Sequence, residues 1–94
     1  MSTHVEVRIK WDESSPGWSA KAFGTKAEAR GDEETIEEKV AEVPASSDHS
    51  PLLVVANAVD QVCEELNVHP RKVDAIVIRA DVAEWLEAAR RFTR

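Results

Sequence analysis

The stretch that decides the fold is Val73–Phe92, VDAIVIRADVAEWLEAARRF, in a chain of 94 residues. Its first part, Val73–Ile78, carries apolar side chains on both faces apart from Asp74, which predicts a strand buried on both sides and central in its sheet. The pattern then changes to helical spacing, where Asp81 and Glu84 form a D-x-x-E capping box. The buried face of this helix is expected to consist of Val82, Trp85, Leu86, Ala89 and Phe92. Such a strand–helix unit favours a parallel pairing through a right-handed crossover.

Two segments at the start of the chain alternate between apolar and polar residues. The apolar side of the first consists of Val5, Val7, Ile9 and Trp11. This period of two predicts a strand with one buried face. Asp12–Gly17, DESSPG, has the composition of a turn, and Trp18–Ala29 then reads as the second arm of a hairpin. Gly24 inside that arm indicates a bulge or a close approach of another segment.

The segment Glu34–Val43 is ambiguous. Ile36, Val40 and Val43 have the spacing i, i+4 and i+7, and Asp32 could cap a helix, so propensity alone favours a helix. The competing interpretation is a third strand at the edge of the sheet, where the many charges would suit exposure to solvent.

A helix is clearly indicated after the linker Pro44–His49. Ser50 is a favourable N-cap, and Pro51 suits the first helical position. The helix should end near Asn67, because Pro70 cannot continue it. Its apolar stripe is predicted to consist of Leu52, Val55, Val59, Val62 and Leu66, with Ala56 and Cys63 beside it.

Composition limits the classes of function. A length of 94 residues with 43% apolar and 32% charged side chains predicts one globular domain, residues 1–94. Cys63 is the only cysteine, which excludes an internal disulfide and fits a reducing compartment. No apolar run approaches the roughly 20 residues that span a membrane, and the N-terminus lacks the apolar region of a signal peptide. We therefore expect a soluble, cytoplasmic protein without membrane contact.

The negative charge is concentrated in one segment. The formal net charge is −6, and Glu28–Glu42 carries seven acidic against two basic residues. This makes nucleic-acid binding an unfavourable interpretation and leaves a protein partner with a basic surface. The alternative is that the segment is simply a solvated, solubilising surface.

The order of the elements resembles the first two-thirds of a ribonuclease H domain, over nearly all of the chain. In that family the first strand ends in an Asp within a turn, a Pro-Gly-rich stretch and an aromatic residue follow, and the second hairpin often begins Arg-Gly. The fourth strand reads apolar-apolar-apolar-x-x-Asp before a helix. The matching residues are Trp11-Asp12-Glu13-Ser14, Pro16-Gly17-Trp18, Arg30–Ile36 and Ile76–Asp81. The resemblance implies a minimal mixed α/β (α+β) fold, β-β-β-α-β-α, with three antiparallel strands, one parallel central strand, two helices and Glu34–Val43 as the third strand.

The resemblance also supplies a test of activity, because those enzymes hold two metal ions with four carboxylates. Asp12 matches the first carboxylate and Asp81 the third, whereas Pro51 stands where the second is expected, and the fourth belongs to a part that the chain does not contain. Two ligands cannot hold two such cations, so we expect no catalytic site, no bound metal and no cofactor. Each aspartate has a structural role instead: Asp12 can bond turn amides, and Asp81 can cap the last helix.

The remaining residues give no stronger catalytic signal. The three histidines and Cys63 show no metal-ligand spacing. Trp18, at the mouth of the first hairpin, could belong to the core or anchor a partner. The leading hypothesis is a non-catalytic protein-binding module, an inhibitor or regulator that acts through an acidic surface. Its contact residues would be Trp18, Glu33, Glu34, Glu37, Glu38 and Glu42.

Three other possibilities stay open. One is a metal-dependent nuclease of ribonuclease H type, completed by a second chain. Another is a non-catalytic nucleic-acid-binding remnant of such an enzyme. An exposed strand edge could also pair two copies of the chain into a homodimer.

Overall fold

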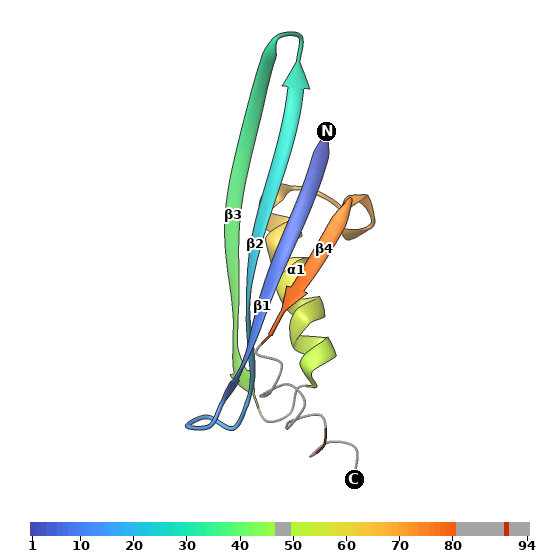
Figure 1. The fold of residues 1–94 in the computed structure, drawn as a ribbon. Coiled ribbons are helices and arrows are strands. Elements are labelled where there is room, and N and C mark those ends of the chain that lie inside the picture. Colours follow the sequence, from blue (N-terminus) through green and yellow to red (C-terminus); the bar gives the residue numbers. More distant parts are fainter. Residues whose placement is uncertain (47–49, 81–89, 91–94) are drawn as a thin grey trace.

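The computed structural model describes residues 1–46, 50–80 and 90 (Figure 1). Its elements are β1 (Ser2–Asp12), β2 (Gly17–Arg30), β3 (Glu33–Ser46), α1 (Pro51–Leu66), the short 3-10 helix η1 (Pro70–Lys72) and β4 (Ala75–Arg79). The strands form one sheet in the order β3-β2-β1-β4, in which β1 and β4 are parallel and the other neighbours are antiparallel. The predicted mixed α+β class is confirmed at this level. The helix predicted for residues 82–92 and its cap, Asp81, lie outside the described residues.

The first hairpin forms as its alternation predicts. Val5, Val7 and Ile9 on β1 are at most 5% exposed, whereas the residues between them face the other side of the sheet. Helix α1 covers the side on which these three residues lie, so the core consists of one layer of helix on one layer of sheet.

β3 is a strand, so the helix that propensity alone favoured for Glu34–Val43 is wrong, and the strand that the resemblance implied is observed. Ala41 and Val43 are buried opposite two buried alanines of β2, which is the period of a strand and not of a helix. β2 reaches β3 through a two-residue turn in which Gly31 has a φ of 62°. A positive φ at this position matches the twist of the flanking strands, and glycine adopts it without strain.

Helix α1 begins and ends where the sequence predicts. The Ser50 side chain accepts a hydrogen bond from the Leu53 N–H at 3.2 Å, and Asn67 ends the helix in the left-handed conformation. Leu52 does not belong to the buried stripe, because it is 73% exposed. No helix among the described residues is long and apolar enough to cross a membrane. The buried face of α1 consists of Val54, Val55, Ala58, Val59, Val62, Cys63 and Leu66.

The apolar face of the sheet ends where α1 ends. Gly24 of β2 lies so close to the helix that a Cβ atom on it would be 2.7 Å from Leu66 Cδ1. Two residues further along the same face stands Lys26, whose Nζ donates to the Leu66 carbonyl oxygen at 3.3 Å. This lysine satisfies a carbonyl that the helix leaves without an internal partner. The core therefore stops between Gly24 and Lys26.

β2 and β3 continue beyond this point (Figure 1). β1 pairs with β2 only as far as Ala27, so residues 28–35 form a two-stranded ribbon, which we call the hairpin arm. The arm carries four acidic residues and one basic residue.

β4 is not the buried central strand that the sequence predicts. In the described sheet it pairs only with β1 and lies at the edge, and Ile76, Val77 and Ile78 are 45%, 49% and 51% exposed. The physical reason is that α1 packs mainly over β2 and β3. A reciprocal pair of hydrogen bonds sets the register of β4: the Thr3 N–H donates to Asp74 Oδ2 at 2.8 Å, and the Asp74 N–H donates to the Thr3 carbonyl at 2.9 Å.

The close approach at Gly24 gives a test of the packing between helix and sheet. In Gly24→Ala the new Cβ would overlap Leu66 and also lie 2.9 Å from Val62 Cγ2, and both of these side chains are fully buried. We expect a loss of about 1–3 kcal/mol in the free energy of unfolding, measured by urea denaturation. Ala29→Ser on the same strand is the control, because Ala29 is exposed in the hairpin arm and exposed substitutions of this kind change stability by about 0.5 kcal/mol or less. Equal stability of Gly24→Ala and the wild type would contradict this packing.

Candidate functional site

Within residues 1–46 and 50–80, no further strand pairs with the outer edge of β3, and this edge carries a regular pattern of side chains. Since Ala41 and Val43 face the helix, the even-numbered residues from 34 to 42 face the opposite side, which α1 does not cover. There, acidic and apolar residues alternate, and all of them are exposed. Ile36 is 58% and Val40 47% exposed. We call this row the β3 stripe: Glu34, Ile36, Glu38, Val40 and Glu42.

The neighbouring residues of β2 extend the apolar part of the stripe. Val40 lies opposite Phe23, and Ile36 lies opposite Ala27. Arg8 of β1 stacks over the Phe23 ring, with its guanidinium carbon 4.9 Å from the ring centroid. The outer face of the hairpin therefore presents two apolar cross-strand pairs that alternate with the glutamates of the β3 stripe.

Most of the acidic charge on β3 is not balanced within the described residues. At the base of the stripe, Glu42 pairs with Lys21 at 3.3 Å. Along the described chain no such ion pair involves the four glutamates nearer the tip, which are Glu33, Glu34, Glu37 and Glu38. All four are exposed, so the negative potential is strongest toward the hairpin arm.

Trp18 does not belong to this surface. It is 1% exposed and packs edge-on against Trp11, with ring centroids 5.5 Å apart. The prediction that Trp18 contacts a partner is therefore wrong, because helix-facing alternation places the ring in the core. The five predicted glutamates are accessible, and their role in binding stays a prediction.

Asp12 has the structural role expected of a turn residue. Its Oδ1 accepts hydrogen bonds from the Ser14 hydroxyl at 2.7 Å, the Ser14 N–H at 3.0 Å and the Ser15 N–H at 3.3 Å. These bonds, that of the Ser14 hydroxyl above all, lower the pKa of the Asp12 carboxyl because they stabilise its charged form. Asp81 lies outside the described residues, so its distance from Asp12 is not defined. No cluster of three or more metal-ligating side chains occurs in residues 1–46 and 50–80.

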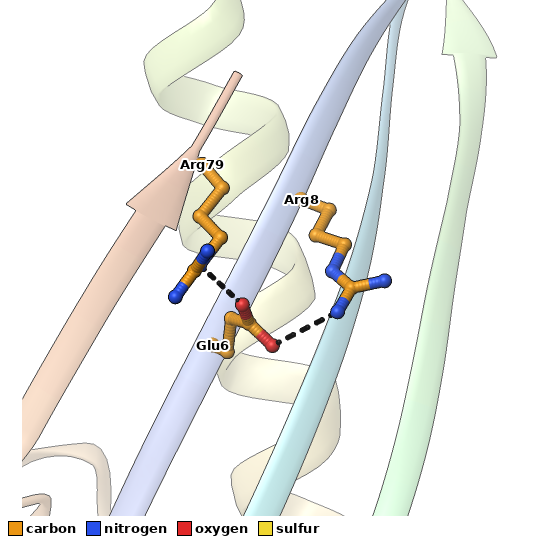
Figure 2. Close-up of polar contacts among 3 residues, drawn as sticks. All are labelled: Glu6, Arg8 and Arg79. Atoms are coloured by element: carbon orange, nitrogen blue, oxygen red, sulfur yellow. Dashed lines mark hydrogen bonds and ion pairs between the residues drawn. The ribbon is translucent and has the colours of Figure 1, made fainter. Parts of the chain in front are cut away.

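A second polar cluster joins β1 to β4 on the outer face (Figure 2). Glu6 of β1 accepts from Arg8 at 3.4 Å and from Arg79 of β4, and its own side chain is 29% exposed. Both arginines are largely exposed, so these pairs contribute at most about 1 kcal/mol. The cluster links β4 to β1 across the outer face, and the single Glu6 carboxylate offsets part of the charge of the two arginines.

Cys63 does not have the features of a reactive thiol. It is fully buried against the sheet, and burial raises the pKa of its thiol, which disfavours the thiolate. His69 caps η1, where its Nδ1 accepts from the Arg71 N–H at 3.1 Å.

Sequence reasoning missed three contacts that position the elements of the sheet and the helix. They are the bond of Lys26 to Leu66, the pair of Glu6 with Arg79, and the reciprocal bonds of Thr3 with Asp74. Two signals were present in the sequence: a lysine that ends a row of small residues at every second position of β2, and the alternation of acidic and apolar residues at the even-numbered positions from 34 to 42. No protein-family model, curated protein or solved structure matches the chain.

The hydrogen bonds of the turn predict how the Asp12 carboxyl titrates. In Ser14→Ala the largest stabilising contact of the carboxylate is lost, so the pKa of Asp12 should move up toward the ordinary value of about 3.9. Because the pKa of Asp12 is lower in the folded protein, the ionised carboxylate stabilises the fold at pH values above its ordinary pKa. This stabilisation is lost as the pH falls through the lowered pKa. NMR titration of the side-chain carboxyl in both proteins measures the change. An unchanged midpoint in Ser14→Ala would contradict the role of the hydroxyl.

Proposed function

We propose that this chain is a non-catalytic protein-binding module, an inhibitor or regulator, that takes up a basic extended segment of its partner along the edge of β3. The observation that carries this proposal is the β3 stripe, in which acidic and apolar side chains alternate along an open strand of 14 residues. We also propose that the fold is a minimal ribonuclease H-like domain, because the order of the elements before residue 81 is compatible with it.

Strand addition explains why the surface has this form. The edge of a sheet presents backbone N–H and C=O groups that a further strand can pair with, and this pairing supplies affinity without sequence specificity. Specificity then comes from alternate side chains. A segment paired with β3 would place basic residues beside the glutamates and apolar residues beside Ile36 and Val40. The partner motif is therefore basic-x-apolar-x-basic-x-apolar-x-basic, where x is a residue that faces the other side of the strand.

The charge on β3 also disfavours one register in which a second copy would occupy this edge. In an antiparallel β3–β3 pair centred on Glu38, glutamates would face glutamates: Glu38 opposite itself and Glu34 opposite Glu42. Like charges directly opposite each other destabilise a strand pair. A basic partner removes this repulsion and gains attraction from the same residues.

The alternative functions have less support on this surface. A nucleic-acid-binding remnant would have to bring phosphates toward the β3 stripe, whose glutamates repel them. A nuclease completed by a second chain would need Asp12 as a metal ligand, whereas one of its oxygens already accepts three hydrogen bonds from the turn.

A peptide-binding experiment tests the proposal directly. The probe, the alternating peptide, is a fluorescent nine-residue peptide with lysine at positions 1, 5 and 9, valine at positions 3 and 7, and threonine between them, so that lysine and valine alternate along one face of the strand. A second peptide contains the same residues in an order without this alternation. We expect the alternating peptide to bind more tightly in fluorescence anisotropy. The triple variant Glu34→Lys/Glu38→Lys/Glu42→Lys should bind it at least ~10-fold more weakly, about 1.4 kcal/mol.

A matched control separates the position of the charges from their number. Asp60→Lys/Glu64→Lys/Glu65→Lys makes the same change in net charge on the exposed side of α1. This variant should bind within about threefold of the wild type, because distant exposed charges are screened by salt. Equal losses in the two triple variants, or equal binding of the two peptides, would overturn strand addition at β3 in favour of unspecific attraction.

A further inference from the structure

The two edges of the described sheet differ in charge. β3 contains five glutamates, whereas β4 has the sequence Ala-Ile-Val-Ile-Arg and contains one charged residue. That residue, Arg79, is paired with Glu6 across the β1–β4 pair. Edge strands of soluble proteins usually carry charges, prolines or bulges that prevent pairing with another chain, and β4 has none of these before Arg79.

Both faces of β4 also expose apolar surface. The register with β1 places Ile76 and Ile78 beside Val5 and Val7 on the helix-facing side, and Val77 beside Glu6 on the outer side. All three residues of β4 remain about half exposed. A strand that is open at its edge and apolar on both faces would gain from a further neighbour on either side.

We infer that β4 pairs with β4 of a second copy of this chain, antiparallel and centred on Val77. In this register Ile76 lies opposite Ile78 of the other copy, Val77 lies opposite Val77, and Arg79 lies opposite Ala75. No two like charges face each other, in contrast to a β3–β3 pair centred on Glu38. The four isoleucines of the two copies form one continuous apolar row on the helix-facing side, which buries the surface that each copy alone exposes.

The pairing would join two four-stranded sheets into one sheet of eight strands, with both β3 edges at its ends. This arrangement does not depend on the function proposed for β3, but it would give the dimer two equivalent β3 edges. Stable dimers usually bury about 1,200 Å² or more, and a strand of 5 residues supplies only part of that area. The association is therefore weak and depends on protein concentration.

Sedimentation equilibrium of the full chain over a wide concentration range tests the inference. The wild type should show a monomer–dimer equilibrium. Val77→Lys should be monomeric throughout, because two lysines would then meet at the centre of the pair, while Glu6 lies beside that position on β1 and tolerates the new charge within one copy. Ile36→Lys is the matched control, since it places the same charge on an exposed apolar residue of the other edge and should leave the equilibrium unchanged.

Disulfide trapping identifies the register independently. Residues directly opposite in an antiparallel pair have Cα atoms about 4.5–5.5 Å apart, which is within the range that a disulfide bridges. Oxidised Val77→Cys should form a covalent dimer, whereas Val40→Cys on β3 should not, and the native Cys63 is fully buried and does not compete. A wild type that stays monomeric at every concentration, or equal trapping of both cysteine variants, would overturn pairing through β4.

Discussion

The structure depends on one mismatch of dimensions between α1 and the sheet. A helix of 16 residues is about 24 Å long, whereas β2 and β3 have 14 residues each and span about 46 Å. The helix is also about 10 Å wide, which covers two strands spaced about 4.8 Å apart. One helix can therefore bury roughly half the length of the hairpin and half the width of the sheet. Along the hairpin, the covered half is the half that the sequence makes apolar.

The limited reach of α1 leaves the hairpin arm and β4 exposed. The hairpin arm is charged, whereas β4 is apolar. Beyond Gly24 the hairpin changes from small apolar residues to charged ones, with Lys26 closing the end of the helix. A two-stranded ribbon is only marginally stable in water, so the hairpin arm would gain most from a further strand. At the other edge, β4 stays apolar although α1 does not reach across it, and its exposed isoleucines are compatible with a neighbour from another chain.

The sequence predicted those features that depend on short-range physics. Alternation predicted β1 and β2, and Ser50, Pro51 and Asn67 predicted the limits of α1, because caps and turns act within a few residues. Features that depend on the reach of α1 could not be predicted in this way. An apolar run such as that of β4 has the same pattern whether a helix covers it or not. Whether Trp18 lies in the core or at the surface depends on which face of the hairpin α1 covers.

The candidate surface was predictable in composition but not in geometry. The composition of β3 shows that the segment is acidic, but the spacing of its apolar residues also fits a helix, in which Ile36 and Val40 would share a face without the glutamates between them. Only the strand brings acidic and apolar residues into one row, and only the strand order shows that this row lies along an open edge.

Amide hydrogen exchange of β3 is the most direct test of the central claim that this edge receives an added strand. In an edge strand every second N–H points away from its neighbour, so these amides exchange readily while those bonded to β2 are protected. On addition of the alternating basic peptide, we expect the outward amides between Glu33 and Val43 to gain protection at every second residue. Protection that does not change along β3, or that rises without this alternation, would contradict strand addition at this edge.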